Sequence, residues 1–107
     1  MSNFSEDIVQ QVWEKAEAIV GYDASKYRKD VCGAWIIRSQ FDKTINLYGW
    51  SIDFIVPLEQ GGKQNIDNMR PVQWQNGLTK VDGRLLCLVR STDSGNYELE
   101  KAQLIEA

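Results

Sequence analysis

Histidine is absent from this chain of 107 residues, and cysteine and proline occur only twice each. Without histidine, no mechanism that uses an imidazole as base, nucleophile or metal ligand is available. The two cysteines, Cys32 and Cys87, do not form a C-x-x-C pair, so the usual Cys/His zinc site cannot be built. No apolar run approaches the roughly 20 residues that a membrane-spanning helix needs.

The N-terminal segment 1–7 is acidic and lacks an apolar centre, which predicts that it is not a secretory signal. We therefore expect a cytoplasmic protein that does not associate with a membrane. Two cysteines permit one disulfide, but in such a compartment we expect Cys32 and Cys87 to stay reduced and buried.

The length and composition predict one globular domain spanning residues 1–107. Hydrophobic residues make up 43% of the chain and charged residues 25%, and eleven aromatic side chains supply apolar area that a disordered chain lacks. The net charge is −3, but residues 26–90 hold ten basic and six acidic side chains, or +4. Contact between this middle segment and phosphate groups is conceivable, although an uneven solvated surface explains the same pattern.

Hydrophobic periodicity indicates an α+β fold. Apolar residues recur at helical spacing over residues 8–20, with Ser5 as the N-cap and Gly21 as the expected end. Runs rich in β-forming residues predict strands over 34–38, 48–56 and 85–89, and a hairpin near residues 93–100. We expect a loop over residues 22–31 and a short helix over residues 72–80.

Residues 49–82 carry the most specific pattern in the chain, reading GWSIDFIVPLEQGGKQNIDNMRPVQWQNGLTKVD. This segment resembles the core of the HNH endonuclease family, and the similarity extends over about residues 13–97. The family positions that match, in order, are Trp50, Asp53, Pro57, Gly61, Gly62, Asn68, Pro71, Trp74, Asn76, Lys80 and Asp82.

The resemblance implies a ββα unit, two strands followed by a helix, spanning about residues 50–82 and packed beside the N-terminal helix and a small antiparallel sheet. Members of the family hydrolyse phosphodiesters in nucleic acid with one divalent metal ion. A histidine acts as general base, an asparagine orients it, and the metal stabilises charge on the phosphate and the leaving oxygen.

This chain departs from that pattern at two positions. Asp53 falls on the first metal ligand and Asn68 on the orienting asparagine, so both are intact. Phe54 falls on the general base and cannot accept a proton. Gly77 falls on the ligand carried by the helix and has no side chain. Asp53 alone is a vestigial metal site, because one carboxylate is a poor Mg²⁺ ligand set.

The resemblance therefore predicts a catalytically inactive HNH-like domain with no tightly bound cofactor, which retains weak, non-specific binding to DNA or contacts a protein partner. Arg70, Lys80 and Arg84 are the expected phosphate contacts. One alternative is an active, Mg²⁺-dependent or similar metal-dependent endonuclease with a relocated base, for which the candidates are Glu59, Asp67 and Asp82. Another is a purely structural domain with no affinity for nucleic acid.

Overall fold

Helix α1 (Glu6–Trp13) is the first element of the structure, a computed structural model that describes residues 4–105. Positions 1–3 of the acidic segment 1–7 lie outside the described residues. The Ser5 hydroxyl accepts a hydrogen bond from the Ile8 amide at 3.2 Å, which confirms the predicted N-cap. The buried face of α1 consists of Val9, Val12 and Trp13.

The helix is shorter than the predicted span of residues 8–20, and this part of the prediction was wrong. Beyond α1 the chain turns, and Glu17 pairs with Lys29 in an isolated antiparallel bridge. The Arg28 guanidinium donates to two carbonyls just past the helix, both at 3.1 Å, and so satisfies acceptors that a longer helix would use. Gly21 has a φ of 91°, but in a later turn rather than at the helix end.

Seven strands form three small antiparallel sheets within residues 4–105. The first sheet pairs β1 (Tyr27–Lys29) with β2 (Trp35–Ile37), and the second pairs β3 (Trp50–Phe54) with β4 (Met69–Gln73). The third contains β5 (Lys80–Val81), β6 (Arg84–Thr92) and β7 (Gly95–Leu104). Short 3₁₀ turns occur at Arg38–Gln40, Leu58–Gln60 and Ile66–Asn68.

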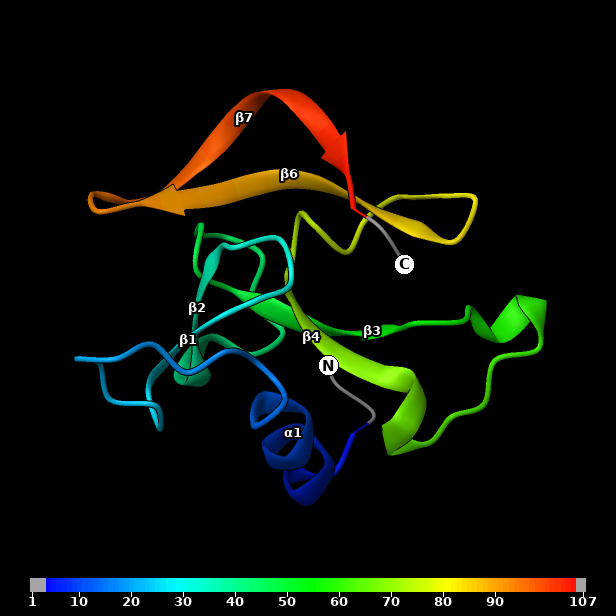
Figure 1. The fold of residues 1–107 in the computed structure, drawn as a ribbon. Helices are drawn as coiled ribbons and strands as arrows, with labels where there is room; N and C mark the ends of the chain where they lie inside the picture. The colour runs from blue at the N-terminus through cyan, green and yellow to red at the C-terminus, as the bar shows by residue number, and fades with distance from the viewer. Residues whose placement is uncertain (1–3, 106–107) are drawn as a thin grey trace.

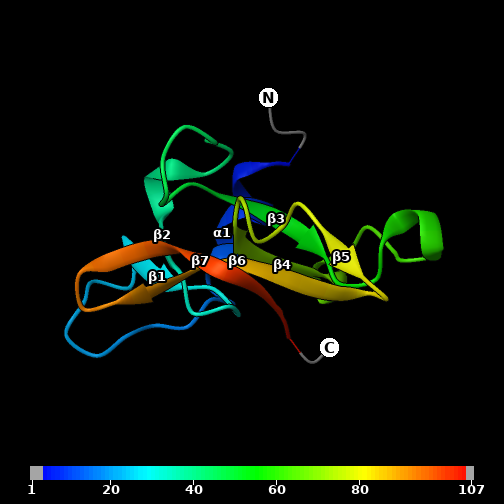
Figure 2. The same cartoon turned by 90° about the horizontal axis from the view of Figure 1, so that it is seen from above.

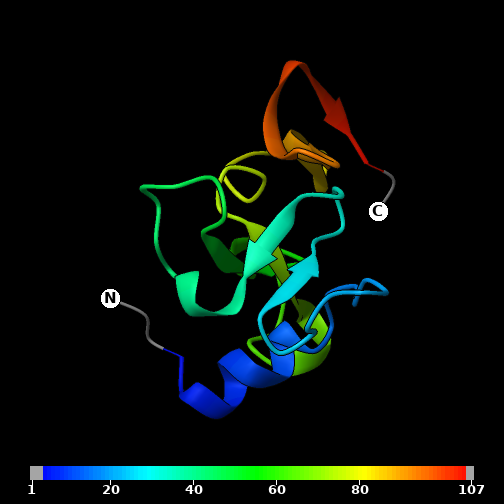
Figure 3. The ribbon, with the colours of Figure 1, turned by 90° about the vertical axis from the view of Figure 1, so that its left-hand side faces the viewer.

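The elements are arranged in layers around the β3–β4 pair. Helix α1 lies on one side of this pair and the long β6–β7 hairpin on the other (Figure 1). Seen from above, β6 lies over β4, with β3 to one side (Figure 2). The β1–β2 hairpin closes one end of the molecule, where it faces the viewer in Figure 3.

The α+β class and the predicted strands are confirmed, but two local predictions were wrong. Residues 22–31 are not all loop, because β1 forms within them. No helix forms over residues 72–80, which contain the end of β4, a series of turns and the start of β5. The helix of the expected ββα unit is thus replaced by turns. No helix among the described residues is long and apolar enough to cross a membrane.

The main core lies between α1 and the β3–β4 sheet. The centres of the Trp13 and Trp50 rings are 5.3 Å apart, and that of the Phe41 ring lies 4.8 Å from Trp50. Both tryptophans are fully buried. On the opposite side, β6 contributes buried side chains at alternate positions, which are Leu85, Cys87 and Val89.

The carboxylate of Asp30 is buried and joins the sheets. It accepts hydrogen bonds from the amides of Cys32, Ala34 and Gln73 and from the Asn76 side chain, at 2.8 to 3.0 Å. Asn76 is itself buried, and its side-chain oxygen accepts from two amides of β6 at 2.8 and 2.9 Å. Burial raises the pKa of the Asp30 carboxyl, and the hydrogen bonds oppose this shift.

Cys32 and Cys87 form a disulfide, with their Cα atoms 5.8 Å apart, so the expectation of two reduced thiols was wrong. The bond links the turn after β1 to the middle of β6. Sequence spacing could not reveal it, because the two residues are separated by 55 positions and meet only once the layers are stacked.

Removing this disulfide should destabilise the fold considerably. Closing a loop of 55 residues stabilises a protein by about 4 kcal/mol in the chain-entropy treatment. The Cys32→Ala, Cys87→Ala double variant should lose about that much free energy of unfolding in urea denaturation. Dithiothreitol should destabilise the wild type and leave the double variant unchanged. A variant as stable as the oxidised wild type would contradict the prediction.

Asp30→Asn should destabilise the protein by about 3 kcal/mol, although the two side chains have nearly the same shape. The carboxylate now accepts hydrogen bonds from four N–H donors, two at each oxygen. The new NH₂ group would face two of these donors and could not accept from them. Urea denaturation at neutral pH measures the loss, and Asp93→Asn, at an exposed turn, is the matched control. Equal stability of Asp30→Asn and wild type would mean that the lost hydrogen bonds contribute nothing to the stability of the fold.

Candidate functional site

The antiparallel register of β3 and β4 places Asp53 opposite Arg70 and Phe54 opposite Met69. A cavity of about 460 Å³ lies beside this end of β3. Its wall includes Asp53, Phe54 and Gly77, which are three of the four positions compared with the family pattern above. Lys80 also lines this cavity. The fourth, Asn68, lies outside the cavity wall.

Asp53 is held by two cations. The Arg70 Nε lies 2.8 Å from one carboxylate oxygen, and the Lys80 Nζ lies 3.2 Å from the other. The Asp53 side chain is only 7% exposed, and those of Arg70 and Lys80 are 17% and 16% exposed. The Lys80 ammonium also donates to the backbone carbonyls of Phe54 and Ile55. The carboxylate is therefore neutralised by groups of the chain itself.

Phe54 is half-buried at the edge of the main core. Its ring centroid lies 6.2 Å from that of Phe4, in the segment before α1. The helix expected over residues 72–80 is not formed beside this ring, and the Trp74 indole donates to the Asn46 carbonyl at 2.8 Å. Position 54 thus contributes apolar contact where the family has a base.

Asn68 fastens the loop that follows β3. Its side-chain oxygen accepts from the Val56 amide at 2.8 Å, and its NH₂ group donates to the carbonyls of Val56 and Lys63, both at 2.9 Å. All three bonds go to the backbone. The side chain that the family uses to orient a histidine therefore holds a loop in this structure.

Gly77 lies in the turns that replace the expected helix. A Cβ atom added there would come within 2.9 Å of the Val72 side chain, which is fully buried. Close packing against Val72 therefore accounts for glycine at this position. The neighbouring Asn76 points away into the Asp30 network and cannot replace the missing ligand.

These residues do not fit a divalent metal ion. Asp53 is the only carboxylate on the β3 strand, and its oxygens already pair with Arg70 and Lys80. A metal ion would have to displace both Arg70 and Lys80 from Asp53, with no further ligand from position 77. Among residues 4–105, no group of three Cys, Asp or Glu side chains gathers closely enough to hold a metal.

The remaining predicted residues are scattered. Of the three candidates for a relocated base, Glu59 is exposed in the cavity wall, whereas Asp67 and Asp82 are exposed elsewhere. Arg84 begins β6, half-buried, and its Nε donates to the Ile105 carbonyl at 3.0 Å. The three expected phosphate contacts, Arg70, Lys80 and Arg84, therefore all make contacts within the protein.

Sequence analysis missed a cluster of aromatic side chains at the β1–β2 hairpin, formed by Tyr27 and Trp35 of the two strands and by Tyr22 and Tyr48 of neighbouring turns. In a strand, residues two positions apart share a face, so a strand over residues 27–29 would have placed Tyr27 beside Lys29. Interpreting residues 22–31 as a loop concealed it.

Comparison of the chain with protein-family models, with curated proteins and with solved structures finds no match.

Asp53→Asn should destabilise the protein by about 2–3 kcal/mol, because it leaves Arg70 and Lys80 partly buried without a counter-charge. Urea denaturation measures the change. Asp82→Asn is the control, since Asp82 is exposed and its φ of 52° suits asparagine. If Asp53→Asn were as stable as the control, the two ion pairs would contribute nothing to the fold.

Proposed function

We propose that this chain is an HNH-like nuclease domain that no longer hydrolyses phosphodiesters and that binds nucleic acid weakly. The observation that carries the proposal is the Asp53 carboxylate, which pairs with Arg70 and Lys80 inside the motif that resembles the family. In the family pattern this carboxylate serves the metal ion. Here its two partners supply the positive charge.

The loss of hydrolysis follows from two independent changes. Phe54 cannot take a proton from water, and a general base is worth about 10²–10⁴-fold in rate. The missing ligand at Gly77 and the ion pairs of Asp53 remove the means of holding a metal, and with it the main stabilisation of charge on the phosphate. Either change alone would slow the reaction strongly.

Nucleic-acid binding rests on the positive middle segment, residues 26–90, which has a net charge of +4. Such binding is non-specific, and its affinity falls as salt displaces the phosphate contacts. Because Arg70 and Lys80 pair with Asp53, a phosphate group that contacted either side chain would compete with that carboxylate. Binding of a protein partner is the alternative to nucleic-acid binding.

Plasmid nicking in Mg²⁺, Mn²⁺ or Ni²⁺ tests the proposal. The wild type should produce no nicking above background, whereas an HNH endonuclease with an intact histidine should nick under the same conditions. A titration of the wild type with duplex DNA at low salt should show weak binding that disappears as salt is raised. Metal-dependent nicking that is lost on Asp53→Ala would contradict the proposal.

Restoring the missing groups sharpens this test. Phe54→His or Gly77→Asn alone should do little, and the pair should do more than their sum, because base and metal site act as a unit. The pairing of Lys80 with Asp53 predicts that adding Lys80→Ala raises nicking further. Circular dichroism must show that each variant folds, since Gly77→Asn crowds Val72. A folded triple variant without nicking would place the loss beyond these positions.

One observation favours the alternative of an active endonuclease. Glu59 lies in the wall of the cavity that contains Asp53 and Lys80, where it could reach a substrate. If the wild type does nick DNA, Glu59→Gln should abolish the activity, while Asp67→Asn and Asp82→Asn should not.

A cytoplasmic location stays a prediction. The Cys32–Cys87 disulfide weighs against it, because structural disulfides are rare in reducing compartments. Thiol alkylation of the protein in freshly lysed source cells, followed by mass spectrometry, would show whether the two cysteines are oxidised there.

A further inference from the structure

The β1–β2 hairpin exposes an aromatic face. Tyr27 and Lys29 on β1 lie opposite Ile37 and Trp35 on β2, and side chains two positions apart share a face of the sheet. The intervening residue, Ile36, is fully buried on the other face. Tyr27, Lys29, Trp35 and Ile37 therefore form one outward surface.

Two further aromatic residues complete this surface. The Tyr22 ring lies 4.7 Å from that of Trp35, and Tyr48 lines the same cavity of about 340 Å³. The wall of the cavity is entirely Tyr22, Tyr27, Trp35, Ile37 and Tyr48. Tyr22 is 57% exposed and Tyr27 is 39% exposed, so their rings are open to a ligand.

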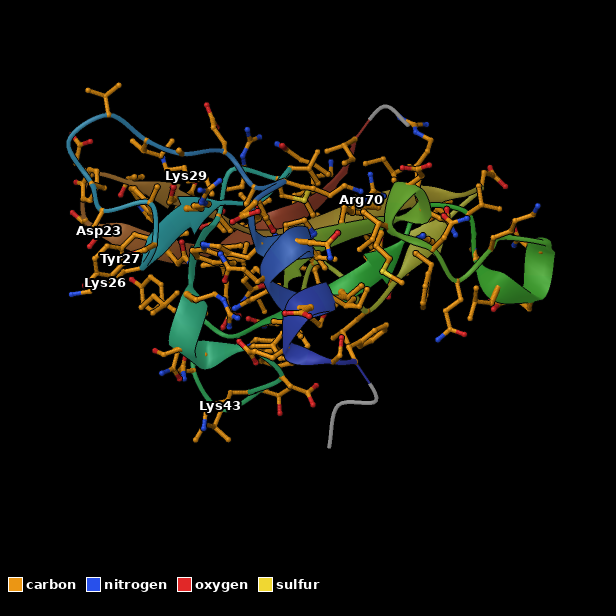
Figure 4. All side chains as sticks on the ribbon, turned by 90° about the horizontal axis from the view of Figure 1, so that it is seen from below. Asp23, Lys26, Tyr27, Lys29, Lys43 and Arg70 are labelled. Carbon is orange, nitrogen blue, oxygen red and sulfur yellow. A yellow bond between two sulfur atoms is a disulfide. The ribbon has the colours of Figure 1, made fainter. Side chains whose placement is uncertain are left out.

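Two lysines border the aromatic surface. The Lys29 Nζ lies 4.9 Å from the centre of the Trp35 ring, and Lys26 lines a second hollow that shares Tyr27 and Ile37 with the first. Neither ammonium forms an ion pair with a described residue. Figure 4 shows Lys26, Tyr27 and Lys29 at the same end of the molecule, with Asp23 beside them and Arg70 on the far side of α1.

The acidic residues near Lys26 and Lys29 do not form ion pairs with these two lysines. The Asp23 carboxylate accepts hydrogen bonds from the amide and hydroxyl of Ser25, at 2.9 and 2.6 Å. These bonds, and to a lesser extent the nearby Lys26 ammonium, lower the pKa of Asp23, and one carboxylate oxygen is held towards Ser25. Glu17 is exposed near Lys29 but makes no ion pair with it. Lys26 and Lys29 therefore remain available to an anionic ligand.

We propose that this aromatic face binds single-stranded nucleic acid, with a base stacked on Tyr22 or Tyr27 and its phosphates beside Lys26 and Lys29. Rings on an exposed sheet with adjacent lysines suit unpaired bases, because each base presents a flat face and each nucleotide an anion. The proposal rests on the nucleic-acid binding proposed above, but it uses a surface separate from the Asp53 site.

Duplex DNA and cationic ligands fit this face less well. The bases of a duplex are already stacked on one another and do not expose a face to a tyrosine ring. An aromatic cage for a quaternary ammonium group needs open ring faces and no competing cation. Here the Lys29 ammonium already lies over Trp35.

Fluorescence anisotropy with a labelled oligothymidine strand, and with a duplex of the same length, tests the proposal. The Tyr22→Ala, Tyr27→Ala double variant should bind the single strand at least tenfold more weakly than wild type. Tyr97→Ala removes a comparably exposed ring, 42% exposed on β7, and should bind like wild type. Tyr27→Phe keeps the stacking ring and should also bind like wild type.

Lys26→Gln should reduce the salt dependence of binding, and Lys101→Gln, on exposed β7, should not.

Each other outcome overturns the proposal in a distinguishable way. Equal loss of binding in Tyr97→Ala, or none in the double variant, would place the strand elsewhere while leaving nucleic-acid binding intact. Binding of the duplex alone would do the same. Competition by a trimethyllysine peptide but not by thymidine nucleotides would identify an ammonium cage. Binding of neither oligonucleotide by folded wild type would overturn this proposal together with nucleic-acid binding by the chain.

Discussion

The buried Asp30 carboxylate is the interaction on which the arrangement of the three sheets depends. The sheets share no backbone ladder, and the carboxylate connects the turn after β1 with Gln73 at the end of β4. Through Asn76 the same network reaches the backbone of β6. A buried charge is tolerated only when its hydrogen-bonding capacity is filled, so the turns that supply these donors have little freedom to differ. These same turns position β3 and the loop after β4.

Local sequence was enough to predict the elements whose stability is local. The Ser5 cap and the apolar face of α1 are examples, as is the alternating pattern of β6. The end of α1 was not predictable in this way, because Arg28 fixes it from fourteen positions beyond Glu14. Residues 69–73 likewise become strand β4 because β3 offers a pairing edge, and this long-range pairing includes residues 72 and 73, where a helix was expected to begin.

The candidate site also has a part that local sequence could predict and a part that it could not. Sequence could identify Asp53 as a position of interest and show that Phe54 is not a base, since both statements concern side-chain chemistry. It could not show that Lys80 reaches Asp53 across 27 positions, which depends on the turns at residues 74–78. The aromatic face was hidden for a related reason. Tyr27 and Trp35 become neighbours only when β1 and β2 pair.

The Cys32–Cys87 bond gives the backbone the topology of a closed ring, with β2 to β5 and most of the Asp53 site inside it. Lys63 is exposed in the loop after β3, within that ring. A protease that cuts beside Lys63 would therefore open the ring without releasing a fragment, and the two pieces would stay joined through sulfur. The chain can thus be cut in this loop and still remain one covalent molecule.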